Sequence, residues 1–154
     1  MKGQFVFEFL IAGLIFFTII IYTINYLNTN VTDYKEKFHQ SWLQNKAVQI
    51  SEVLMGEGSP LSLTENGEFN LTKIQNFNLS YCNPDGNYRD LIEDLHLFEK
   101  TNYGLFAGNV RIVLSLPGEV LMDCGPRIPG SPRAETRRVG VFNGNIAKLD
   151  IVVW

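Results

Sequence analysis

A chain of 154 residues is long enough for one domain and one additional element, but too short for two large domains. Its formal net charge of −3 at pH 7 lacks the basic surplus of most nucleic-acid-binding proteins, so we expect no specific nucleic-acid partner. The composition is 45% hydrophobic, and these residues are concentrated near the N-terminus.

The segment from Phe5 to Tyr26 is apolar apart from a few weakly polar side chains and one charge, Glu8. As a helix rising about 1.5 Å per residue it would measure about 33 Å, enough to cross a hydrocarbon core of about 30 Å. A secretory signal peptide has a shorter apolar stretch and a small-residue cleavage site, whereas this run ends in Tyr22 and Tyr26, typical of an aromatic interface belt. The sequence therefore predicts a membrane-spanning helix.

Two features distinguish this segment from a plain membrane anchor. A short basic stretch, residues 1–3, ends in Gly3 directly before Gln4, and Glu8 places a carboxylate where a charge costs about 2.5 to 3.5 kcal/mol. In these residues the chain resembles archaeal type IV pilin-like proteins with class III signal peptides. In that family a basic leader ending in glycine is followed by glutamine, any residue, serine, any residue and glutamate. Val6 stands here at the serine position.

The resemblance implies that a prepilin peptidase cuts between Gly3 and Gln4 and that the hydrophobic helix is retained. It implies three further partners: copies of the chain itself or related pilins, the pilus assembly platform in the membrane, and the lipid bilayer before assembly. The chain would cross the cell membrane once, with a short cytoplasmic N-terminus and an extracellular head, and would then enter a surface filament.

Glu8 lies one helical turn from Gln4, on nearly the same face. In a filament we expect the Glu8 carboxylate of one subunit to pair with the free α-amine at Gln4 of a neighbour, which would fix the axial register. The alternative is a carboxylate that snorkels to nearby lipid headgroups.

The helical pattern continues beyond the membrane segment, because apolar residues recur at steps of three or four. Gly56 to Pro60 then predict the end of the helix at about Met55. We expect the first stripe to pack against the head: Leu27, Val31, Tyr34, Phe38 and Trp42, with Leu43, Ala47, Ile50 and Leu54 adjoining. The chain thus divides into a leader (1–3), a transmembrane helix (4–26), a helical stalk (27–55) and a head (56–154).

Turn and capping signals predict the first part of the head. Asn66-Gly67 indicates a hairpin within residues 61–69, and Asn70 is placed to cap a short helix over residues 71–77. Apolar spacing then predicts a second helix over residues 88–98.

The last third of the chain is strand-like, with a second Asn-Gly turn between its final two strands. The result is an α+β fold, in which a long N-terminal helix packs on a small head with a four-stranded antiparallel sheet, in general resemblance to pilin-like proteins. The predicted strands are Asn109–Leu116, Glu119–Cys124, Arg138–Phe142 and Ile146–Trp154.

Cys82 and Cys124 both lie beyond the hydrophobic segment, so they would face the same side of a membrane. A disulfide between them would stabilise the head by roughly 4 kcal/mol in an oxidising space; two buried thiols are the alternative. Sequons at Asn30, Asn70 and Asn78 are candidate glycosylation sites, with coincidence in an asparagine-rich sequence as the alternative.

The loop from Gly125 to Arg133 and the arginines that flank it, from Arg127 to Arg138, form either a positive patch for an anionic surface or an ordinary solvated loop. No P-loop, dinucleotide fingerprint, zinc spacing or nucleophile constellation occurs, and His39 and His96 are expected to be ordinary side chains. We therefore expect no catalytic residue, cofactor or metal. The leading hypothesis is a pilus-like filament subunit, and the alternative is a permanently anchored surface protein whose head binds a partner.

Overall fold

The computed structural model describes residues 2–82, 87–101, 104–127 and 133–154, with side chains from residue 7 onward except at 99–101 and 104–107. The chain separates into two compact units, Met1–His39 and Gln40–Trp154, and the second is called the head unit below. The helices are α1 (Lys2–Met55), α2 (Leu71–Phe77), the π-helical turn η1 (Asn78–Cys82) and α3 (Tyr88–Asp94).

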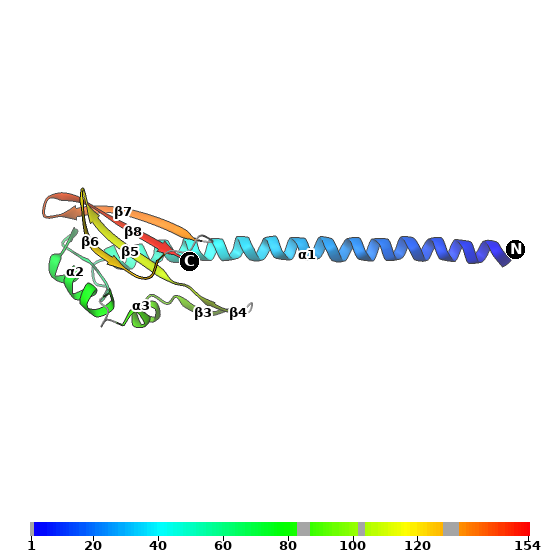
Figure 1. Ribbon diagram of the computed structural model, residues 1–154, viewed down its shortest axis with the longest axis horizontal. Coiled ribbons are helices and arrows are strands. Elements are labelled where there is room, and N and C mark those ends of the chain that lie inside the picture. The colour runs from blue at the N-terminus through cyan, green and yellow to red at the C-terminus, as the bar shows by residue number, and fades with distance from the viewer. Residues whose placement is uncertain (1, 83–86, 102–103, 128–132) are drawn as a thin grey trace. The chain divides into compact units, whose positions relative to one another are not determined.

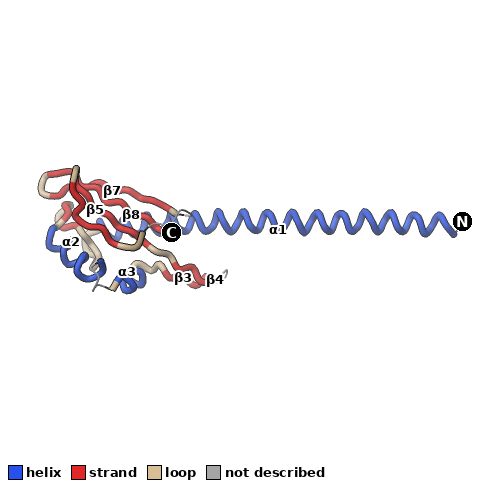
Figure 2. Tube along the Cα trace, viewed as in Figure 1, coloured by secondary structure: helices blue, strands red, loops and turns tan. Residues whose placement is uncertain are grey.

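The head unit is built on a four-stranded antiparallel sheet with the order β6-β5-β8-β7, which confirms the predicted α+β layout (Figure 1). Two-stranded hairpins accompany it, one of β1 and β2 and one of β3 and β4. Figure 2 shows these strands alternating with loops after the long helix. The strands are β1 (Thr64–Glu65), β2 (Glu68–Phe69), β3 (Phe98–Thr101), β4 (Gly104–Ala107), β5 (Val110–Leu116), β6 (Glu119–Cys124), β7 (Ala134–Phe142) and β8 (Asn145–Val153).

Helix α1 spans 54 residues and ends at Met55 as predicted. Of its two apolar stripes, the one with Leu43, Ala47, Ile50 and Leu54 is buried in the head core. The other stripe begins in the first unit, where Leu27, Val31 and Tyr34 are exposed by 55%, 51% and 62%, and its last member, Trp42, packs against the head core as predicted. Helical spacing defines a common face, but it does not determine what covers that face.

Both Asn-Gly signals produce tight turns. Asn66 and Gly67 have φ angles of 52° and 81°, as a two-residue hairpin of type I′ requires, and the second Asn-Gly pair joins β7 to β8 in the same way. Asn70 caps α2 as predicted, since its side-chain oxygen accepts hydrogen bonds from the backbone N–H groups of Thr72 and Lys73.

The predicted second helix ends earlier than expected. Its last turn closes with hydrogen bonds from the His96 N–H to the Glu93 carbonyl and from the Leu97 N–H to the Ile92 carbonyl, both 3.0 Å. These two bonds form a Schellman motif, with His96 at the left-handed position (φ 50°) that glycine usually occupies. The chain then enters the β3–β4 hairpin, so the prediction of helix through Phe98 is wrong.

The core of the head unit lies between the inner face of the sheet and the last turns of α1, with α2 and α3 contributing further apolar side chains. Alternate residues of β5 and β8 point into it, including Ile112, Leu114, Leu149 and Ile151. Gly140 on β7 is required by close packing, because a Cβ there would lie 2.6 Å from the Phe69 ring.

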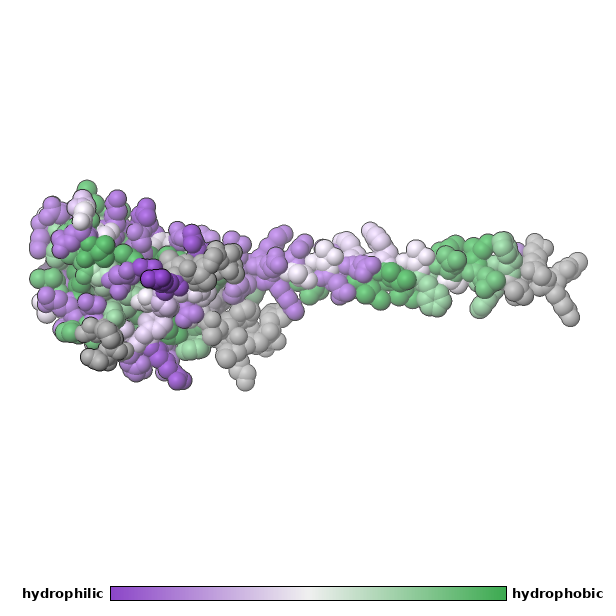
Figure 3. All heavy atoms as spheres, viewed as in Figure 1, coloured by the Kyte–Doolittle hydropathy of each residue, from purple (hydrophilic) through white to green (hydrophobic). Residues whose placement is uncertain are grey.

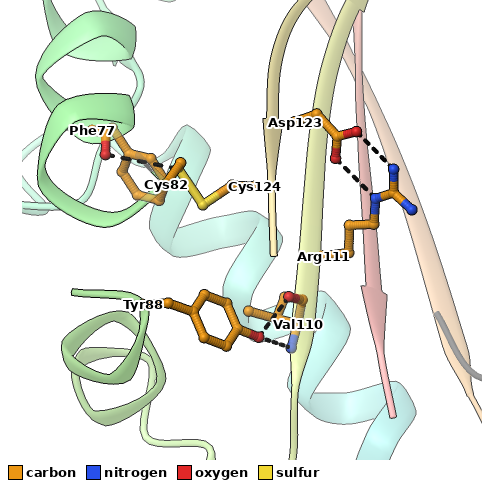
Figure 4. Close-up of a disulfide and its surroundings, with 7 residues drawn as sticks. All are labelled: Phe77, Cys82, Tyr88, Val110, Arg111, Asp123 and Cys124. Atoms are coloured by element: carbon orange, nitrogen blue, oxygen red, sulfur yellow. Dashed lines mark hydrogen bonds and ion pairs between the residues drawn. A yellow bond between two sulfur atoms is a disulfide. The ribbon is translucent and has the colours of Figure 1, made fainter. Parts of the chain in front are cut away.

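Beyond the end of β6, the hydroxyl of Tyr88 forms the hydrogen bonds to β5 that a neighbouring strand would otherwise form. The Asn109 and Trp154 backbones exchange two hydrogen bonds, so the N–H and C=O of the next residue, Val110, point away from β8. The Tyr88 hydroxyl donates to the Val110 carbonyl (2.8 Å) and accepts from the Val110 N–H (2.9 Å), as Figure 4 shows. Burial raises the pKa of the Tyr88 phenol, an effect that its backbone hydrogen bond partly offsets, so the hydroxyl remains a donor at neutral pH.

The predicted disulfide joins Cys82 of η1 to Cys124 at the end of β6, with the two Cα atoms 4.8 Å apart (Figure 4). It attaches the α2–η1 segment to the β6 edge of the sheet. Gly125 follows directly with a φ of 112°, and a Cβ there would lie 2.2 Å from the Val110 carbonyl oxygen. Glycine therefore allows the chain to leave the sheet beside Tyr88.

We predict that Tyr88→Phe lowers the free energy of unfolding by about 1 to 3 kcal/mol, because it leaves two buried backbone groups of Val110 without their partner. The measurement is urea unfolding of the purified protein in detergent, followed by tryptophan fluorescence. Tyr81→Phe is the matched control, since the Tyr81 hydroxyl donates to the exposed Asp94 and its loss should cost no more than about 0.5 kcal/mol. Equal losses for the two variants would contradict the role assigned to Tyr88.

Candidate functional site

The apolar first part of α1 is the most unusual surface of this protein. Its most apolar 18-residue window has a mean hydropathy of 2.3, and none of that window is buried. Figure 3 shows hydrophobic side chains gathered along this part of the helix, whereas the visible surface of the head is largely hydrophilic. By length and composition, α1 is able to cross a membrane.

Several polar side chains along this helix donate a hydrogen bond to the helix backbone. The Thr18 hydroxyl donates to the Leu14 carbonyl and the Thr23 hydroxyl to the Ile19 carbonyl, each at 2.8 Å. The same hydrogen bond to the carbonyl four residues earlier recurs further along at Thr29, Asn30 and Thr32. In an apolar environment an unsatisfied hydroxyl is costly, so these bonds suit the helix to surroundings without water.

Glu8 is the charged residue within the apolar run of this helix. Its side chain is exposed, and among the described residues no hydrogen bond or ion pair involves its carboxylate. At 100° per residue, Glu8 lies on the helix face that also carries Ile15, Ile19 and Tyr26. In an apolar environment a charged Glu8 needs a partner, and none of the side chains described from residue 7 onward supplies one.

The predicted cleavage residues, Gly3 and Gln4, lie where the backbone is already helical, since α1 begins at Lys2. Their side chains lie outside the described set. Further along, Tyr22 and Tyr26 stack with ring centroids 6.4 Å apart, at the end of the apolar run where an interface belt is predicted.

The structure separates the three sequons. Asn30 and Asn78 are exposed, on α1 and at the start of η1 respectively. Asn70 is half-buried and both ends of its side-chain amide are engaged, because its nitrogen also donates to Glu65 (2.6 Å). A glycan at Asn70 would therefore compete with the capping of α2.

The arginines near the proline-rich loop do not form an unopposed positive patch. Arg133 pairs with Glu135 (2.8 Å), Arg137 pairs with Asp150, and the Arg138 guanidinium lies 4.0 Å from Glu52. Arg138 also donates to the Ser51 hydroxyl (3.0 Å), which links β7 to α1. Arg127 is exposed, and residues 128–132 of the loop lie outside the described set. Neighbouring carboxylates thus offset much of the charge that the sequence places here.

Within the described part of the chain, no three histidine, cysteine or acidic side chains lie close enough together to hold a metal ion. His96 is exposed at the end of α3, and the two cysteines are bonded to each other. Shallow depressions of the head surface, such as the one beside Tyr81, Tyr88 and Pro126, are open to solvent.

Arg111 and Asp123 form the best-defined ion pair on the outer face of the sheet. The guanidinium donates two hydrogen bonds to the two carboxylate oxygens, at 2.8 and 2.6 Å. These bonds lower the pKa of the Asp123 carboxyl, while its partial burial acts in the opposite direction. The pair joins β5 to β6 near the disulfide, as Figure 4 shows.

We predict that this pair makes the stability of the head dependent on acidic pH. Because the folded-state pKa of Asp123 is lowered, its contribution is present above the unfolded-state value of about 3.9 and is lost as pH falls through the folded-state pKa. Both side chains are partly exposed, so we expect at most about 1 kcal/mol. In urea unfolding, the free energy of unfolding of Asp123→Asn should fall less on acidification than that of the wild type. Glu119→Gln, on the same strand, should lose as much as the wild type. Parallel pH profiles for Asp123→Asn and the wild type would contradict this.

No family model, curated protein or solved structure matches this chain.

Proposed function

We propose that this chain is a structural subunit, a major or minor pilin, of an archaeal type IV pilus-like surface filament. A prepilin peptidase would cut it between Gly3 and Gln4, and the assembly platform would transfer its apolar helix from the bilayer into a bundle of such helices. The proposal requires no enzymatic activity. Two observations support it: the length of the exposed apolar surface of α1, and the position of Glu8 within that surface.

The length of the uncovered apolar surface is the observation that carries the proposal. Exposed large apolar residues run along α1 from Phe7 to Tyr34. At about 1.5 Å per residue, Phe7 to Tyr34 spans roughly 40 Å, beyond a hydrocarbon core of about 30 Å. A bilayer would cover the first part only. The steps of four, three and four between Leu27, Val31, Tyr34 and Phe38 are those of a seam between packed helices.

Glu8 supports the same conclusion from the other end of the helix. A filament provides the missing partner, because each mature subunit ends in an α-amine one turn away, at Gln4. Pairing of these charges between neighbours would offset the cost of burying either one, and it would favour one axial register of the subunits.

A permanently anchored surface protein is the second candidate. The observation that favours it is the match between the most apolar part of α1 and the thickness of one bilayer, which lipid alone would satisfy. In that case Met1 would be retained and Glu8 would reach the headgroups.

We predict that the mature protein begins at Gln4. Intact-mass measurement of protein from native membranes and from sheared surface material should give the mass without residues 1–3 in both. Gly3→Val should keep the leader and leave the protein in the membrane fraction, because the bulky side chain occupies the cleavage position. Protein in the sheared fraction that retains Met1 would contradict the filament proposal and favour the anchored alternative.

We also predict that Glu8→Ala is processed normally but that its amount in sheared filaments falls at least about tenfold, since loss of a charged hydrogen-bond partner costs about 1.5 to 3 kcal/mol per contact. The matched control is Glu36→Ala, which removes an exposed acid from the same helix outside the apolar run. Normal filaments of Glu8→Ala would exclude the register role.

A further inference from the structure

The two edges of the four-stranded sheet differ. On the β6 side the pairing with β5 contains a register shift, and the disulfide attaches η1 to this edge. On the other side β7 pairs with β8 without a shift along all nine of its residues, and among the described residues no backbone hydrogen bond joins its outer side to another segment. Figure 1 shows β7 as the outermost strand on its side of the sheet. Natural proteins usually protect such an edge.

The backbone groups on the open edge can be identified from the register. The turn between Phe142 and Asn145 contains two residues, so Phe142 and Asn145 form a hydrogen-bonded pair. Hydrogen-bonded pairs alternate along an antiparallel ladder, so the even-numbered residues of β7 direct their backbone groups toward β8. The remaining residues direct their N–H and C=O groups outward: Glu135, Arg137, Val139 and Val141. Their side chains lie on the outer face of the sheet, and Val139 is 59% exposed.

We propose that this edge pairs antiparallel with the same edge of a second copy of the chain, about a two-fold axis at Thr136. In this register Glu135 of each copy lies opposite Arg137 of the other, so the two-fold axis produces two cross-strand charge pairs. A register centred on Arg137 would place like charges opposite each other. The proposed pairing joins two four-stranded sheets into one of eight strands.

The ion pairs that Glu135 and Arg137 form within one chain do not prevent these residues from pairing with a second copy. Glu135 contacts Arg133 and Arg137 contacts Asp150, and in each pair at least one side chain is more than half exposed. Exposed pairs of this kind contribute about 0 to 1 kcal/mol, so either residue can reorient toward a second copy at little cost. The pairing involves head units only and does not require the proposed filament.

The test uses the full chain in lipid nanodiscs that each hold one copy, so that the bilayer-embedded part of α1 cannot associate. The variants below lie on the head, so they distinguish pairing through β7 from pairing through the part of α1 outside the bilayer. Sedimentation velocity across a concentration series should show pairs of wild-type discs. Val139→Pro removes one outward N–H without touching the bonds to β8, and it should weaken the association at least about tenfold. Val139→Lys provides a second variant should the proline variant not fold. The matched control is Val120→Lys, equally exposed at 60% but on the β6 edge, which should associate like the wild type.

A charge-swap mixture tests the register. Glu135→Arg alone and Arg137→Glu alone should each associate weakly, because like charges then face each other across the axis. An equimolar mixture of the two should associate like the wild type, because opposite charges face each other at both positions. Single wild-type discs at every concentration, unchanged association of the folded Val139 variants, or a mixture no stronger than its components would each overturn the proposal. None of these outcomes bears on cleavage after Gly3 or on the role of Glu8.

Discussion

The constraint on which the rest of this structure depends is the cost of exposing the apolar surface of α1 to water. The head unit covers its own apolar residues, because the sheet, the last turns of α1 and the short helices enclose a common core. The first unit cannot do so, since a single helix has no inner face, and its large apolar side chains are exposed. Folding is therefore completed within the head, whereas the N-terminal unit needs lipid or other helices around it.

Sequence reasoning succeeded where structure depends on residues that are close together in the chain. The Asn-Gly turns, the Asn70 cap and the end of α1 near Met55 follow from backbone preferences of a few residues each. The four strands of the main sheet were also predictable, because alternation of apolar residues marks the inner face of β5 and β8. The role of Glu8, one charge in an apolar segment, remains a prediction.

The features that could not be predicted depend on partners far away in the sequence. β7 begins at Ala134 rather than Arg138, because its first inward residues are small or polar and give no apolar alternation. The β3–β4 hairpin replaces the last predicted turn of a helix. Tyr88 completes β5 from 22 residues away, and no pattern in the sequence indicates that contact. The pairing of the arginines with Glu135, Asp150 and Glu52 likewise requires the strand register to be known.

The disulfide also determines how the head responds to a pulling force. When a chain is pulled from its two ends, each residue that unfolds adds about 3.4 Å of length. Cys82 and Cys124 are separated by 42 positions in the sequence, and the segment between them cannot be extended while their sulfur atoms are bonded. The disulfide thereby prevents roughly 140 Å of chain, which includes β5 and most of β6, from being extended. Under such a force the head can lengthen only through the segments outside this loop.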